Sequence, residues 1–185
     1  MGQIDGGRVA ARQWKAAGID TLFGVVAGPT IEILAGAAAE GMKVVGCRHE
    51  ENGAFMASAW GFLKHKPGVL VTGSGPGTTN ALTPLYHATE SAMPLVVLGG
   101  STHSATRGIG GFQEGDQIGL MKPACKWAQS VDCVERIPEL VYLALGKASS
   151  GRPGGVYLDF PGEICGTKVD EATLSFRAQP TIARP

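Results

Sequence analysis

Short, unbroken apolar runs that alternate with segments of helical periodicity limit most strongly what this chain can fold into. The runs lack the polar–apolar alternation of half-exposed strands, as expected of strands covered by helices on both faces. They occupy residues 21–26, 42–47, 69–72, 93–98, 126–131 and 155–160. Helices are expected over residues 9–17, 30–40, 50–63, 78–89, 116–121 and 137–149. The pattern predicts an α/β fold, a doubly wound, six-stranded, mainly parallel sheet with helices on both faces.

Charge and hydropathy exclude several classes of partner. The 185 residues carry 16 basic and 16 acidic side chains, so the net charge is zero, which argues against nucleic acid or an anionic membrane as partner. Residues 1–12 are charged and lack an apolar core, so they do not resemble a signal peptide. The longest apolar run, residues 93–98, is far too short to cross a bilayer. A cytoplasmic location is expected.

The domain is predicted to end near residue 168. Residues 1–168 are enough for a core that needs neither disulfides nor metal. After Gly166 the composition becomes polar and proline-containing, and residues 169–185 are predicted to form a linker towards an absent central domain. The chain therefore has the character of one domain of a longer protein.

The spacing of cysteine and histidine gives no metal site. The four cysteines are scattered and form no C-x-x-C pair, and the four histidines lack the spacing of ligands. In a cytosolic chain such cysteines are most simply buried small hydrophobic residues. We expect no metal site made wholly by this chain.

A carboxylate, Glu50, stands where the apolar run at residues 42–47 passes into a helix. The carboxyl ends of parallel strands meet at one edge of the sheet, where open α/β folds place their ligands. The simpler alternative is that Glu50 is the N-cap of the helix. Glu51 lies about 100° further around that helix and cannot face the same ligand.

A glycine-rich turn at residues 72–80 follows the next strand. Glycine permits positive φ and close approach of the backbone, so such turns often hold phosphate or a ring. The turn lacks the Gly-Lys-Ser/Thr of a Walker A loop, the G-x-G-x-x-G spacing and strand position of a dinucleotide fingerprint, and the glycine that a nucleophile elbow needs at Thr72. It is either a steric turn or a ligand loop.

A long glycine- and serine-rich loop at residues 99–111 leads into Phe112 and Gln113. Loops of this length inside a compact domain are usually functional. Phe112 could pack on a flat ring and Gln113 could hydrogen-bond a polar substrate. Alternatively, Phe112 only anchors the loop.

Taken together and in this order, these motifs resemble the amino-terminal pyrimidine-binding domain of thiamine diphosphate-dependent enzymes. The likeness covers roughly residues 3–170 and is to the acetolactate synthase, oxalyl-CoA decarboxylase and 2-hydroxyacyl-CoA lyase type. The matching segments are residues 23–29, 48–50, 74–80, 112–114 and 151–154. The chain departs from the family pattern at Glu51 (often glutamine), at Trp60 (often tyrosine) and around Val26.

The resemblance implies a role for each site residue. Glu50 would be catalytic, hydrogen-bonding N1′ of the aminopyrimidine and favouring its imino tautomer. Gln113, also catalytic, and Phe112 would lie on the substrate side. The remaining cofactor-binding residues would be Val26, Ala27, Pro76, Gly77 and Asn80. The chemistry would make or break a C–C bond next to the carbonyl of a 2-keto acid or acyl-CoA substrate, as in a decarboxylase, a lyase or a carboligase of the transferase class.

The resemblance also implies partners. In the family, the diphosphate and its Mg²⁺ are held by another domain, which belongs to a partner subunit of a homodimer or homotetramer. That domain carries a Gly-Asp-Gly…Asn-type motif, which does not occur in this sequence. The isolated chain is therefore expected to be inactive and to bind thiamine diphosphate weakly, and FAD would be bound only by the full-length enzyme. The alternatives are a separate alpha subunit of a two-chain decarboxylase, a nucleotide- or flavin-binding module, and a non-catalytic interaction domain.

Overall fold

The computed structural model describes residues 2–179 and is built around a six-stranded sheet in which every pairing is parallel. The spatial order is β3-β2-β4-β5-β7-β6. The strands are β2 (Thr21–Gly24), β3 (Lys43–Gly46), β4 (Gly68–Thr72), β5 (Leu95–Ser101), β6 (Trp127–Ser130) and β7 (Gly155–Pro161). All six predicted strands are present, and the predicted parallel sheet is confirmed.

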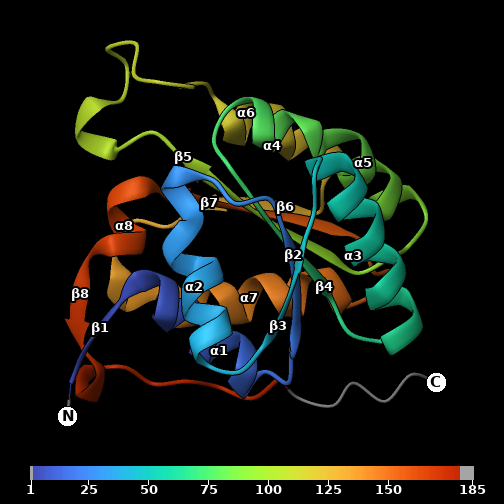
Figure 1. Cartoon of the computed structure of the whole chain (residues 1–185). Helices are drawn as coiled ribbons and strands as arrows, with labels where there is room; N and C mark the ends of the chain where they lie inside the picture. Colours follow the sequence, from blue (N-terminus) through green and yellow to red (C-terminus); the bar gives the residue numbers. More distant parts are fainter. Residues whose placement is uncertain (1, 180–185) are drawn as a thin grey trace.

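Helices cover both faces of this sheet (Figure 1). One face carries α1 (Gly6–Ala16), α2 (Ile31–Ala39), α7 (Ile137–Ser149) and the short α8 (Gly162–Gly166). The other carries α3 (Glu50–Lys64), α4 (Pro76–Asn80), α5 (Leu82–Glu90) and α6 (Gln117–Met121). Single 3₁₀ turns lie at η1 (Gly28–Thr30), η2 (Ser104–Thr106), η3 (Lys122–Ala124), η4 (Val134–Arg136) and η5 (Glu171–Thr173). The doubly wound prediction is therefore confirmed.

The two layers of helices create two apolar cores, one on each side of the sheet. Successive strand residues point to opposite faces, so Val69 and Val71 of β4 belong to the core beneath α1, α2 and α7, whereas Leu70 belongs to the core beneath α3 and α5. The central strands β2, β4, β5 and β7 are buried along their whole length. This two-sided burial explains why their sequences are continuous apolar runs.

Two elements differ from the sequence-based expectation. The helix predicted over residues 78–89 is divided into α4 and α5 at Ala81, because Pro84 has no N–H to donate to the carbonyl four residues earlier. The strand predicted to end at residue 98 continues to Ser101. Its extension needs glycine, because a Cβ on Gly99 would lie 2.6 Å from the Tyr157 hydroxyl oxygen.

A segment near each end of the chain takes part in a small second sheet that the sequence did not reveal. Strand β1 (Gln3–Asp5) pairs antiparallel with β8 (Lys168–Asp170). Beyond β8, the Gln13 amide donates to the carbonyl of Arg177 at 2.8 Å and accepts from its N–H at 3.0 Å. Residues 169–179, predicted as the start of a linker, thus lie against the domain, and residues 180–185 fall outside the described part of the chain. The boundary at residue 168 stays a prediction.

The order of strands reverses at two places, and each is a place for a ligand. The chain runs outward from β2 to β3 and returns to β4, and it runs outward from β5 to β6 and returns to β7. In open α/β sheets ligands bind outside the carboxyl ends of the strands at such switch points.

Within residues 2–179, every helix is too short or too polar to span a lipid bilayer.

Candidate functional site

Glu50 is the first residue of α3, and residues 47–49 separate it from the end of the edge strand β3 at Gly46. The position that caps the helix belongs to His49, whose Nδ1 accepts a hydrogen bond from the Glu51 N–H at 3.3 Å. The alternative in which Glu50 is the N-cap is therefore wrong. Its carboxylate is left for contacts outside its own helix.

Those contacts come from α4, which starts at the carboxyl end of β4. The Asn80 side-chain amide donates to Glu50 Oε2 at 2.9 Å. Gly77 faces the other oxygen, and a Cβ at Gly77 would lie 3.0 Å from Glu50 Oε1. Within residues 2–179 no hydrogen bond reaches Oε1, and the residue is half-buried. One carboxylate oxygen is thus fixed by the protein, and the other is an open acceptor near the β2–β4 switch point.

The glycine-rich turn holds α4 in place through unusual backbone geometry. Gly75 has φ 52° and ψ −108°, and a Cβ there would lie 2.7 Å from the carbonyl oxygen of Gln113. Only glycine fits this position. The Thr78 hydroxyl also stabilises the turn, because it donates to the carbonyl of Gly73 at 3.0 Å. The turn is therefore sterically required and also brings Gly77 and Asn80 to Glu50.

The loop between β5 and α6 projects from the body of the domain (yellow-green in Figure 1) and is organised by Glu114. The Glu114 carboxylate accepts the backbone N–H groups of Gly108, Gly110 and Gly111, the last two at 3.0 and 2.8 Å. The hydrogen bonds from Gly108 and Gly111 lower the pKa of Glu114. A single carboxylate thus gathers the glycine-rich part of the loop.

The two predicted site residues of this loop, Phe112 and Gln113, lie in different environments. Gln113 has φ 55°, and its Oε1 accepts the Ser74 hydroxyl at 2.9 Å, so it lies on the glycine-rich turn. Phe112 is 85% exposed, and the interpretation in which it anchors the loop is wrong, because Glu114 holds the loop instead. Gln113 is therefore brought to the turn that carries the contacts of Glu50, whereas Phe112 points into solvent.

The segment after β2 supplies the remaining predicted contacts. Ala27 lies beside Gly73, where a glycine Cβ would come within 2.8 Å of the Ala27 Cβ. The Thr30 hydroxyl ties this segment to the carbonyl of Thr72 at 3.1 Å. Val26 is 67% exposed, and Pro76 is also exposed. The structure thus gathers Glu50, Gly77 and Asn80, adds Ala27, Pro76 and Gln113 around the same turn, and leaves Val26 and Phe112 exposed.

A buried polar cluster near the β5–β7 switch point was not predicted. Asp159 of β7 is 2% exposed and accepts hydrogen bonds from Ser101 at 2.8 Å, Ser130 at 3.0 Å and Tyr157 at 3.0 Å. Burial, followed by the Asp159 charge, raises the pKa of Tyr157 well above its usual value, so its hydroxyl stays a donor. The signal that could have revealed this cluster is a charged residue inside the buried run 155–160.

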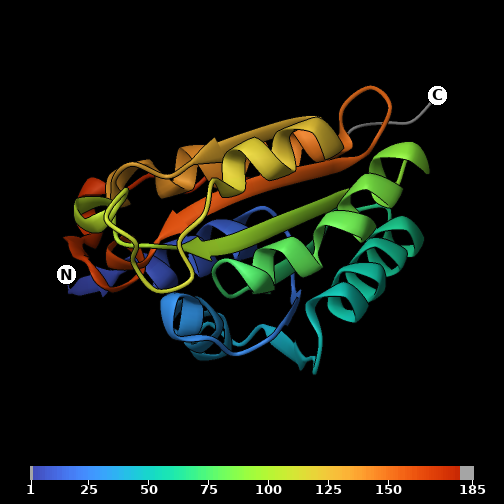
Figure 2. The same ribbon diagram turned by 90° about the horizontal axis from the view of Figure 1, so that it is seen from above.

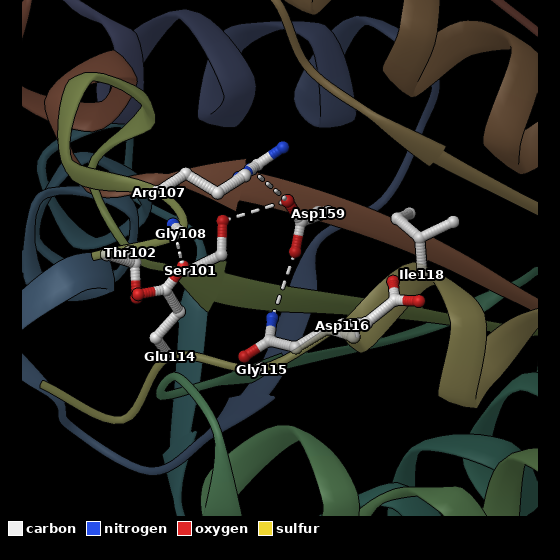
Figure 3. A pocket seen from close by; sticks show the side chains of 10 residues that line it. Ser101, Thr102, Arg107, Gly108, Glu114, Gly115, Asp116, Ile118 and Asp159 are labelled. Atoms are coloured by element: carbon white, nitrogen blue, oxygen red, sulfur yellow. Dashed lines mark hydrogen bonds and ion pairs between the residues drawn. The ribbon is translucent and has the colours of Figure 1, made fainter. Parts of the chain in front are cut away.

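The same cluster borders a cavity of about 310 Å³ (Figure 3). Arg107 and Ser101 both point at Asp159, and the Arg107 guanidinium lies 3.7 Å from its carboxylate. The lining residues are Ser101, Thr102, Arg107, Gly108, Glu114, Gly115, Asp116, Gln117, Ile118 and Asp159. Within residues 2–179 no three His, Cys, Asp or Glu side chains are arranged to hold a metal ion.

An exposed apolar face lies along the two helices nearest the site. Helices α3 and α5 pack side by side (teal and green in Figure 2). Large hydrophobic side chains on them remain exposed: Phe55, Met56, Phe62, Leu63 and Tyr86. Several large exposed hydrophobic side chains on two neighbouring helices indicate a candidate interaction surface. We call these five residues the α3–α5 face.

Comparison with known proteins matches residues 4–120 to the family described as "Thiamine pyrophosphate enzyme, N-terminal TPP binding domain". The 2-hydroxyacyl-CoA lyase of Oryza sativa subsp. japonica is 43% identical over 162 residues, which are 88% of this chain and 28% of that protein. The oxalyl-CoA decarboxylase of Escherichia coli K12 is 36% identical over 169 residues (90% and 30%). The acetolactate synthase large subunit IlvG of Mycobacterium tuberculosis is 37% identical over 155 residues (84% and 28%). The chain thus spans less than a third of the length of these relatives.

Proposed function

This chain belongs to the thiamine pyrophosphate enzymes as their N-terminal TPP-binding domain, and we propose that Glu50 activates the cofactor there. The half-satisfied carboxylate carries the proposal. Asn80 holds Glu50 Oε2 at 2.9 Å, while Oε1 accepts nothing within residues 2–179 and lies beside a glycine. An open carboxylate oxygen next to a position without a side chain fits a flat heterocycle that carries a ring nitrogen.

The residues of the chain would divide the work as follows. Thiamine diphosphate supplies an electron sink for C–C chemistry next to a carbonyl. Glu50 would share a proton between its Oε1 and N1′ of the aminopyrimidine, and Asn80 would hold the carboxylate in place through its Oε2. The backbone at Pro76 and Gly77, with Val26 and Ala27 opposite, would bind the ring. These residues would hold the ring in position and share one proton with it.

Gln113 and Phe112 would face the substrate. Ser74 occupies Gln113 Oε1, and within residues 2–179 the Gln113 amide nitrogen donates no hydrogen bond. Its N–H groups are therefore available to a substrate carbonyl oxygen. Phe112, which is exposed, would cover the substrate from outside. We propose a 2-keto acid or acyl-CoA substrate, since the named relatives include acyl-CoA lyases and decarboxylases as well as acetolactate synthase.

The α3–α5 face would receive the domain that holds the diphosphate and Mg²⁺. It begins five residues after Glu50, at Phe55, whose ring meets His87 of α5 edge-on at 5.5 Å. A partner domain bound there would bury this apolar surface and deliver the cofactor to Glu50. The chain alone would be inactive, and measurable turnover by the isolated chain would contradict this proposal.

The test replaces Glu50 by Gln in the protein that combines this chain with its diphosphate-binding domain. Loss of a positioned acid–base group should lower kcat by at least ~10²-fold. The matched control is Glu51→Gln, which removes the same charge one residue further on and should leave kcat within about twofold of the parent. Unchanged kcat in Glu50→Gln, with bound thiamine diphosphate confirmed by its protection against thermal unfolding, would refute the proposal.

A further inference from the structure

We propose that Gln117 is a positioning residue for Glu50, an inference that rests on the proposed role of Glu50. Gln117 is the first residue of α6, 3% exposed, and lies between the buried cluster at Asp159 and the glycine-rich turn. Its Oε1 accepts the Gly75 N–H at 2.5 Å. The orientation of the amide follows from this partner, because only the oxygen can accept.

The other end of the Gln117 amide, with its two N–H donors, lies within hydrogen-bond distance of three acceptors. Its Nε2 lies 2.9 Å from the carbonyl oxygen of Gly100, 2.8 Å from the Tyr157 hydroxyl and 2.9 Å from Asp159 Oδ1. Asp159 is itself held by further hydroxyl donors from β5, β6 and β7. A side chain anchored at one end in the sheet and at the other on Gly75 ties the turn to the sheet.

The anchored turn in turn sets the place of α4. Gly75 is the residue that precedes α4, and no side chain caps this helix from within the turn. The five-residue helix then presents Gly77 and Asn80 to Glu50. A shift of the Gly75 backbone therefore moves both groups that define the Glu50 carboxylate.

Hydrogen bonds, more than close packing, determine the position of Gln117. On one side Gln117 and Asp159 line the cavity of about 310 Å³, where the dashed contacts of Asp159 converge in Figure 3. The cavity leaves space on that side for a side chain of slightly different shape. Replacing the amide by an apolar group of similar size should therefore release the turn without creating a clash.

The experiment compares Gln117→Met with Ser130→Ala in the protein that combines this chain with its diphosphate-binding domain. Both variants remove a hydrogen bond to Asp159, but Ser130 does not contact the turn. We expect Gln117→Met to lower kcat by about tenfold with KM within about twofold, since a misplaced group costs rate more than binding. Ser130→Ala should keep the parent kcat. Amide hydrogen exchange in residues 73–81 should quicken by about tenfold in Gln117→Met alone.

A double-mutant cycle identifies the path of the effect. If Gln117 acts through Asn80, Gln117→Met should cost much less in an Asn80→Ala background than in the parent. Additive losses, or a kcat in Gln117→Met equal to that of Ser130→Ala, would overturn the positioning role. Glu50→Gln is measured in parallel to separate the two proposals. Only an unchanged kcat in Glu50→Gln contradicts the role of Glu50. Where Gln117→Met does not fold, Gln117→Asn, which keeps the amide but is too short to span both partners, takes its place with the same expected losses.

Discussion

Adding one methyl group at Gly77 should separate activity from stability. In the structure a Cβ at this position would lie 3.0 Å from Glu50 Oε1, closer than ordinary van der Waals contact. Glu50 must therefore give way by a few tenths of an ångström, and its hydrogen bond from Asn80 at 2.9 Å must lengthen or bend. The methyl group also occupies the space that the proposed ring would use.

The two consequences differ in size. Gly77 lies in a helix, where alanine is favoured over glycine by up to about 1 kcal/mol. A weakened hydrogen bond costs about 0.5–1.5 kcal/mol, so the free energy of unfolding should change by less than about 1 kcal/mol. A misplacement of about 1 Å can cost ~10²-fold in rate, so the smaller shift here should lower kcat by 10- to 100-fold, about 1.4–2.8 kcal/mol of barrier.

The assay is steady-state turnover of Gly77→Ala beside thermal unfolding of the same preparation. Thr79→Ala is the matched control, because Thr79 is exposed on the same helix and its hydroxyl donates to the carbonyl of Pro76 at 3.1 Å, away from Glu50. In a Glu50→Gln background Gly77→Ala should add little. A kcat within twofold of the parent would refute the reasoning, as would a loss of activity matched by a loss of stability.

Two predictions concern the fold. Burial acts to raise the pKa of Glu40, but hydrogen bonds from Arg8 and Arg12 outweigh it and leave the pKa lowered. The stabilisation of the fold by these ion pairs is therefore present above the unfolded pKa of about 4.5 and is lost as the pH falls through the folded pKa. Glu40→Gln should therefore unfold more easily near neutral pH, by about 1 kcal/mol, and should match the parent in denaturant titrations only once the pH lies below the folded pKa of Glu40. Gly7→Ala would place a Cβ 2.3 Å from the Glu32 backbone and should lower the free energy of unfolding by about 1–3 kcal/mol. Gly46→Ala is the control, because a Cβ there would have no atom within 4 Å, and it should leave the stability unchanged. Equal melting temperatures of the two variants would contradict this prediction.

The sequence predicted the sheet because its strands are buried on both faces. A strand that is buried on both faces has a continuous apolar sequence, and β4 and β7 are buried in this way along their whole length. The antiparallel pair β1–β8 gave no such signal, since each strand has three residues with only the middle one buried. The break at Ala81 was written in the sequence as Pro84, but the helical period of residues 78–89 concealed it.

The site was predictable where a residue type fixes its own geometry. The glycine-rich turn and the acid after a strand indicated their positions, because glycine and strand ends have few structural uses. The clamp formed by Glu114 and the bridge formed by Gln117 could not be read in this way. Each depends on partners that lie far along the chain or on backbone groups, as when Gln117 joins Gly75 to Asp159. Polar side chains of this kind acquire a meaning only from the partners that the fold gives them.

The contrast between the two carboxylates explains how one domain can carry both a rigid frame and an open site. Asp159 is buried and receives donors from three strands and from α6, so it stabilises a single arrangement of the carboxyl edge. Within residues 2–179, Glu50 receives one donor, from Asn80, and its other oxygen stays open. A fully satisfied carboxylate has nothing to offer a ligand, whereas a half-satisfied one is positioned and still able to bind. Gln117 links the two, and the rigidity of the first is thereby passed to the second.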